Sequence, residues 1–134
     1  MCRLAALVAI AATVAACGAS RAPTRAEPVV FGVSGGNLAP FRATIEPSGQ
    51  LEYTGLPKPR RTHVSRAKAA SLSRLVQAAF AGGLKSRRCP GTNPDIVSGF
   101  IRVSGRTVTV HGSCEPGFTK LWDELAHAAF VGRG

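Results

Sequence analysis

Acidic residues are scarce in this chain. Its 134 residues include seven Asp and Glu against 17 Lys and Arg, which gives a formal net charge of +10. The few carboxylates are scattered, so neither a calcium loop nor a glycosidase carboxylate pair can be assigned. The length suits one small domain and excludes the large catalytic scaffolds. Because 45% of the residues are hydrophobic, the composition is typical of a globular protein and not of a disordered one.

The uninterrupted apolar run at the N-terminus is too short to cross a membrane. As a helix, Leu4 to Ala16 would reach about 20 Å, whereas the hydrocarbon core is about 30 Å thick. With Arg3 before it, the run is typical of a signal peptide. The residues Val14-Ala15-Ala16-Cys17 resemble the lipobox of bacterial lipoproteins, which implies cleavage before Cys17 and attachment of diacylglycerol to its thiol. The alternative is an ordinary secretory signal with a cysteine at its boundary.

The lipobox resemblance implies an organisation for the whole chain. Residues 1–16 would be the signal peptide, residues 17–28 the lipidated Cys17 with a short tether, and residues 29–131 a single domain. The mature protein would be held by acyl chains on the extracytoplasmic face of the cell membrane, because two chains suffice for stable anchoring.

Few cysteines then remain to be paired. Cys2 leaves with the signal peptide and Cys17 carries lipid, so only Cys89 and Cys114 remain in a compartment that permits disulfides. A bond between them would stabilise the domain by about 3 kcal/mol. The alternatives are two free thiols, or a metal site that combines both cysteines with His111, although no fourth zinc ligand is apparent.

The pattern of apolar and turn residues predicts an α+β domain. Strands are expected near 29–33, 41–46, 51–54, 96–103 and 106–111, and helices from Ser65 to Phe80 and from Pro116 to about Val131. This β-β-β-α-β-β-α order favours an antiparallel sheet of about five strands, covered on one face by two helices.

The expected core follows from the spacing within each element. In the second strand, Phe41, Ala43 and Ile45 share the buried face. The other side chains expected in the core are Leu72, Leu75, Val76, Ala79 and Phe80 on the first helix, Ile101, Val103, Val108 and Val110 on the hairpin, and Phe118, Leu121, Trp122, Leu125 and Ala129 on the last helix.

This layout resembles the emfourin-like family of small bacterial proteins. The matching residues are Gly35-Gly36 in the first turn, Leu72, Leu75 and Phe80 on the helix, Ile101 to Val103 with Val108 to Val110 in the hairpin, and Leu121 with Leu125 at the end. The name-giving member inhibits a thermolysin-like metallopeptidase, so the resemblance implies a peptidase inhibitor. The partner-binding loop would be Gly35, Gly36, Asn37 and Leu38, with Leu38 filling the peptidase pocket unless it packs as an ordinary hairpin leucine.

Basic residues are concentrated in a stretch without any Asp or Glu. They are Lys58, Arg60, Arg61, Arg66, Lys68 and Arg74, followed by Lys85, Arg87 and Arg88. Outside the membrane, their expected partners are anionic lipid headgroups or anionic wall polymers, not nucleic acid. The alternative is that these charges serve solubility only.

No residue cluster specifies a reaction. Gly32 to Gly36 matches the G-x-S-x-G pattern, but Asn37 to Pro40 follows where a nucleophile elbow needs a helix. Asp123 and His127 lie four residues apart, as in a surface ion pair, and His63 and His111 have no apparent partners. The sequence therefore predicts a monomeric, non-catalytic envelope binding module without metal or cofactor, or alternatively a structural lipoprotein whose basic face binds polyanions.

Overall fold

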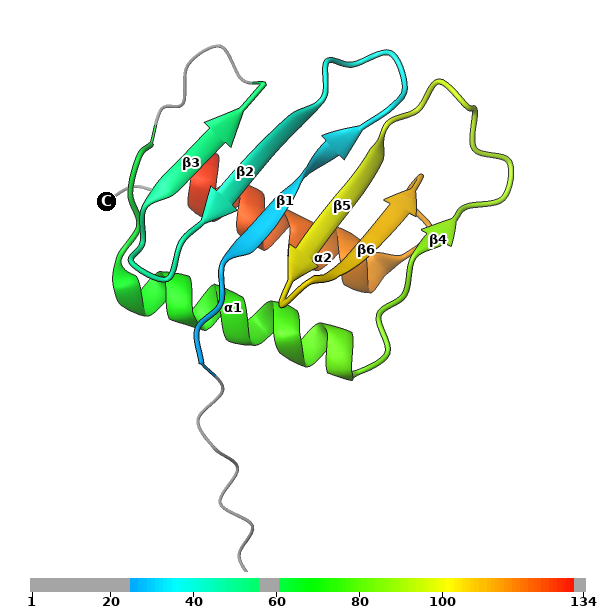
Figure 1. Ribbon diagram of the computed structural model, residues 1–134. Helices are drawn as coiled ribbons and strands as arrows, with labels where there is room; N and C mark the ends of the chain where they lie inside the picture. Colours follow the sequence, from blue (N-terminus) through cyan, green and yellow to red (C-terminus); the bar gives the residue numbers. More distant parts are fainter. Residues whose placement is uncertain (1–24, 56–60, 132–134) are drawn as a thin grey trace, which may run out of the picture.

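The computed structural model describes residues 25–55 and 61–131, which form an α+β domain (Figure 1). The signal peptide, Cys17, Lys58 and Arg60 lie outside these residues. The elements in chain order are β1 (Val29–Ser34), β2 (Phe41–Ile45), β3 (Leu51–Thr54), α1 (Arg66–Ala81), β4 (Arg87–Arg88), β5 (Ser98–Val103), β6 (Arg106–His111), α2 (Pro116–Ala126) and a π-helical segment (His127–Val131).

The sheet has six strands in the order β3-β2-β1-β5-β6-β4. Five of them pair antiparallel, as expected of a sheet of about five strands, and β4 adds a sixth, parallel edge strand beside β6, which makes the sheet mixed. Strand β4 consists of two exposed arginines, which show none of the alternation of apolar and polar residues that predicts a strand. Their pairing depends on contacts with residues far along the chain, such as the hydrogen bond from the Cys89 amide to the His111 carbonyl at 2.9 Å.

The hairpin of β5 and β6 forms at the predicted turn. Ser104 and Gly105 occupy its two central positions with φ of 50° and 73°, as a type I′ turn requires. The first strand of the hairpin is shorter than predicted, since β5 begins at Ser98 and not at Ile96. The amides of Asp95 and Ile96 instead bond to Asn93, which folds these residues into a turn.

One face of the sheet is buried beneath both helices. The predicted alternation in β2 is confirmed, because Ala43 and Ile45 are buried while Arg42 is exposed. The predicted core residues of the hairpin and of α2 join the same cluster, which consists chiefly of Val29, Phe31, Ala43, Ile45, Leu72, Val76, Phe80, Ile101, Val103, Val108, Val110, Phe118, Leu121 and Leu125. The opposite face is open and polar.

Helix α1 begins as predicted but buries a different stripe. The Ser65 side chain caps the helix by accepting a hydrogen bond from the Lys68 amide at 3.1 Å. Leu75, expected in the core, is 45% exposed, whereas Ser73 is buried. The buried Ser73 hydroxyl does not lack hydrogen-bond partners, because its oxygen accepts hydrogen bonds from the Glu27 amide and from Gln77.

The last helix widens at its end and contacts the far strand. The Tyr53 hydroxyl on β3 donates to the Ala129 carbonyl at 2.8 Å, within the π-helical segment. Burial raises the pKa of the Tyr53 phenol, while the nearby Arg61 guanidinium opposes that rise. Asp123 and His127 are both exposed and form no ion pair with each other within the described residues. The predicted surface link is therefore not formed, although the His127 amide keeps the ordinary helical bond to the Asp123 carbonyl.

Two leucines of α1 provide a test of this packing. We expect Leu72→Ala to lower the free energy of unfolding by about 2–5 kcal/mol, because it leaves a cavity in the core. The matched Leu75→Ala variant removes the same atoms from an exposed site and should stay within about 0.5 kcal/mol of wild type. Urea denaturation measures both, and equal losses would contradict the placement of α1.

Candidate functional site

Two loops meet at the edge of the molecule opposite α1 (Figure 1). They are residues 35–40, between β1 and β2, and residues 89–97, between β4 and β5; we call this region the loop end. The Asn37 amide donates to the Asp95 carbonyl at 3.0 Å. Gly36 has φ of +67°, and a Cβ atom there would lie 2.5 Å from the Asp95 oxygen. Only glycine therefore allows the two loops to approach this closely.

The loop end exposes two large apolar side chains. Leu38 is 65% exposed and Ile96 is 47% exposed, and the other exposed large hydrophobic residue in the described chain is Leu75 on α1. Leu38 is therefore not a packed hairpin leucine, and it protrudes from the loop that the sequence assigned to partner binding. Ile96 was missed as a surface residue because its neighbours read as the start of a strand.

A disulfide fixes the second loop to the end of β6. Cys89 and Cys114 are bonded, so the predicted pairing is confirmed. Neither free thiols nor a metal site that uses both thiolates is compatible with this bond. The Cys114 amide also donates to the Cys89 sulfur at 3.0 Å, and Gly112 allows the close packing because a Cβ there would lie 2.8 Å from Cys89 Cβ.

An apolar pocket of about 370 Å³ opens on the helix side of Ile96. Its walls include Val33, Val97, Phe118 and Trp122. Trp122 Nε1 is buried without a hydrogen-bond partner, alone among the buried side-chain nitrogens and oxygens of the described residues. A ligand in this pocket would therefore need an apolar body.

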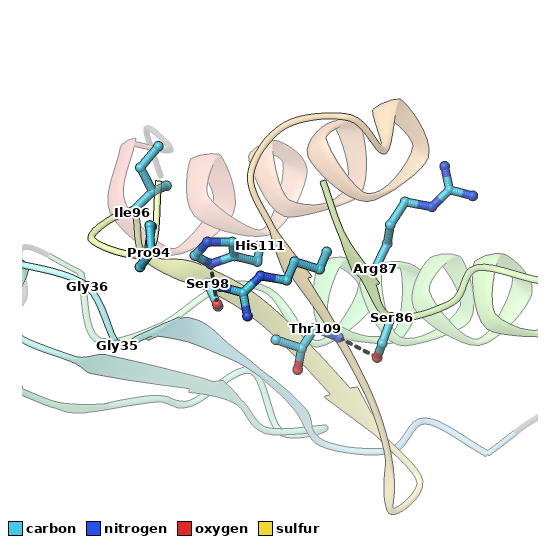
Figure 2. A pocket seen from close by; sticks show the side chains of 10 residues that line it. Gly35, Gly36, Ser86, Arg87, Pro94, Ile96, Ser98, Thr109 and His111 are labelled. Carbon is cyan, nitrogen blue, oxygen red and sulfur yellow. Dashed lines mark hydrogen bonds between the residues drawn. The ribbon is translucent and has the colours of Figure 1, made fainter. Parts of the chain in front are cut away.

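A second, polar pocket of about 470 Å³ lies on the other side of Ile96, on the open face of the sheet (Figure 2). We define the polar pocket by Ser86, Arg88, Ser98, Thr109 and His111. Figure 2 shows Ser98 beside His111, where Ser98 Oγ and His111 Nδ1 are 3.1 Å apart. His111 Nε2 lies 3.2 Å from the Asn93 carbonyl. His111 is thus not the solitary imidazole that the sequence suggested.

The two arginines of β4 point to opposite sides of the sheet. Arg87 is in register with buried Val110, and its Nε lies 3.7 Å from Glu115. Figure 2 accordingly shows the Arg87 side chain directed away from Ser98 and His111. Both arginines contribute to the wall of the polar pocket, but only Arg88 is in register with His111.

The remaining residues of the predicted polyanion site are not brought to this pocket. Arg61 donates to the carbonyls of His63 and Ala128, and Arg66 and Lys68 lie in the first turn of α1. Helix α1 is about 24 Å long, and β4 follows its opposite end. Of the predicted basic residues that the structure describes, Arg66 and Lys68 therefore lie on α1, Arg87 and Arg88 lie on β4, and Arg61 lies apart from both, so they do not form a single face.

The G-x-S-x-G pattern forms a turn. Ser34 ends β1, and Gly35 and Gly36 both have positive φ, so no helix follows the serine. Within residues 25–55 and 61–131 there is no group of three or more His, Cys, Asp or Glu side chains arranged to hold a metal ion. No helix in the same residues is long and apolar enough to span a bilayer.

Comparison with known proteins finds no matching family model, curated protein or solved structure. The resemblance to the emfourin-like family and to a lipobox therefore stays a prediction, and the argument for function rests on the loop end and its two pockets.

The disulfide should be required for a rigid loop end. We expect the double variant Cys89→Ala, Cys114→Ala to lose about 3 kcal/mol of unfolding free energy, because the bond closes a separation of 25 residues. The amides of residues 87–97 should also exchange with deuterium faster. Ser113→Ala, an exposed neighbour, is the control. An unchanged urea midpoint in the double variant would contradict this role.

Proposed function

We propose that this protein is a lipid-anchored, extracytoplasmic binding module without catalytic activity, and that its loop end engages a partner protein. The observation that carries the proposal is the exposure of Leu38 and Ile96 on two loops joined by the hydrogen bond from Asn37 to Asp95. Binding energy in protein interfaces is concentrated in a few apolar anchors of this kind.

The loop end is organised before it meets a partner. The disulfide holds the 89–97 loop, and the close contact at Gly36 holds the 35–40 loop against it. A loop that is already ordered pays less conformational entropy on binding, so two small anchors can support a specific complex. The apolar pocket beside Ile96 would receive an apolar side chain of the partner.

A peptidase is the partner class that this shape fits best. A narrow, rigid edge with a protruding leucine can enter a substrate cleft and fill a primed-side pocket without being cleaved. The resemblance to the emfourin-like family points to a thermolysin-like metallopeptidase, and an envelope location would place the module beside secreted enzymes of that class.

The arrangement of the two ends suits an anchor at Cys17. The first described residues pack on α1, where the Arg25 carbonyl accepts from Gln77 and the Glu27 amide donates to Ser73. Figure 1 shows this entry point at the end opposite the loops. A chain held by lipid at Cys17 would thus present Leu38 and Ile96 away from the membrane.

Leu38 and Ile96 should carry the affinity for a peptidase. We expect the wild-type protein to inhibit a thermolysin-like enzyme, and Leu38→Ala and Ile96→Ala each to weaken inhibition by about tenfold or more. Leu75→Ala is the matched control, because it removes a leucine from α1 that is 45% exposed, close to the 47% of Ile96. Absence of inhibition at micromolar protein would reject a thermolysin-like partner, and equal effects of all three variants would reject the loop end as the interface.

A second candidate role is contact with anionic lipid through α1. This helix contains no Asp or Glu, exposes Arg66, Lys68 and Arg74, and lies at the end where the chain enters the domain. Each cation near an anionic surface contributes about 1 kcal/mol, and salt screens this attraction. Such contact would orient the anchored domain and is compatible with a partner at the loop end.

Two experiments test the lipid anchor at Cys17 and the contact of α1 with anionic lipid separately. We expect intact mass analysis of membrane fractions to find acyl chains on Cys17, and Cys17→Ser to release the protein. The released variant should co-sediment with anionic vesicles at low salt and lose this binding when Arg66, Lys68 and Arg74 are changed to Gln. An unmodified, freely soluble wild-type protein would contradict the anchor, and equal binding to neutral vesicles would contradict the α1 contact.

A further inference from the structure

We propose that the polar pocket is a binding site for a phosphate group. This inference concerns the open face of the sheet and is independent of the partner proposed for the loop end. It rests on the charge of the pocket, on its hydroxyl groups and on the hydrogen bonding of His111.

The pocket carries positive charge, and the acid next to it in the chain, Asp95, lies between the lining residues Pro94 and Ile96 but is not itself part of the walls. Arg88 contributes its guanidinium, and no Asp or Glu is among the described residues that line the walls. The one acid in an ion pair with this part of the chain, Glu115, is engaged by Arg87 on the helix side of the sheet. An arginine beside a concave, polar surface favours an oxyanion, because its N–H groups can donate two parallel hydrogen bonds.

Three hydroxyl groups line the polar pocket: Ser86 just before β4, Ser98 on β5 and Thr109 on β6. Ser86 Oγ accepts a hydrogen bond from the Thr109 amide at 2.9 Å, so its own O–H remains free to donate. The Thr109 and Ser98 hydroxyls also line the pocket, and Figure 2 shows these side chains on the same side of the sheet. Donors that approach from several directions suit the tetrahedral oxygens of phosphate better than the two coplanar oxygens of a carboxylate.

The hydrogen bonds that His111 makes differ between its neutral and its protonated ring. The Asn93 carbonyl can only accept, so Nε2 must carry the hydrogen of that bond. In the neutral ring, Nδ1 then accepts from the Ser98 hydroxyl. When the ring is protonated, Nδ1 donates to Ser98 Oγ instead, and the Ser98 hydroxyl hydrogen becomes available to the anion.

Calorimetric titration of the full chain, with its disulfide intact, tests the site with inorganic phosphate as the probe. We expect saturable binding. Arg88→Gln should reduce the affinity about tenfold or more, because it removes a charged donor. Arg87→Gln is the matched control: Arg87 also contributes to the pocket wall, but its guanidinium lies beside Glu115 on the other side of the sheet, so the affinity should stay within about twofold.

Further variants and ligands make the test specific. Acetate should bind at least about tenfold more weakly than phosphate. Leu38→Ala should leave phosphate binding unchanged, so the failure of one proposal is distinguishable from the failure of the other. Titration with vesicles that contain phosphatidylglycerol shows whether a lipid headgroup also reaches the site, and loss of that binding in Arg88→Gln would support the same pocket.

The proposal is overturned by any of three results. These are no saturable binding of phosphate up to about 10 mM, equal losses in Arg87→Gln and Arg88→Gln, or equal affinities for acetate and phosphate. Arg88 is exposed on a short edge strand, so its substitution should not disturb folding, and an unchanged urea midpoint verifies this.

Discussion

The attachment of the 87–97 segment to the end of β6 is the constraint on which the rest of this molecule depends. The Cys89–Cys114 bond and the hydrogen bond from the Cys89 amide to the His111 carbonyl hold β4 parallel to β6. This one attachment places Arg88 beside His111 and sets the loop that carries Ile96 against Gly36. A covalent link is suited to this task, because two exposed arginines have too little apolar surface to hold an edge strand by packing.

The elements on either side of the core give the domain two different ends. At one end, α1 packs against residues 25–28 and exposes basic side chains, and at the other the two loops expose Leu38 and Ile96 (Figure 1). The antiparallel strands between them are joined by short turns and share a continuous core. Because α1 and the two loops lie at opposite ends of this sheet, the contacts proposed with lipid and with a partner protein use different surfaces and can be made at the same time.

Much of the fold follows from local patterns in the sequence. Ser65 as a helix cap, the Ser104-Gly105 turn and the alternation in β2 each reflect an interaction between residues close in the chain. The errors arise where a distant residue intervenes. Leu75 has the spacing of a core position, yet Ser73 is buried in that region because Glu27 supplies its hydrogen bond. Ile96 continues an apolar run, but bonds to Asn93 turn it out of the strand.

For the candidate site too, local sequence patterns predicted some features and distant contacts decided the others. The two-residue turn at Ser104-Gly105 can be recognised from the sequence. It places Ser98 opposite His111, because each step away from the turn pairs one residue of β5 with one of β6. The pairing of Cys89 with Cys114 likewise was predicted without coordinates, whereas the exposure of Leu38 was left open until the structure showed it. Only the tertiary structure brought Arg88 to His111, separated Arg87 from it, and set Leu38 and Ile96 on joined loops. These contacts join segments far apart in the chain, and no local propensity encodes which of them will meet.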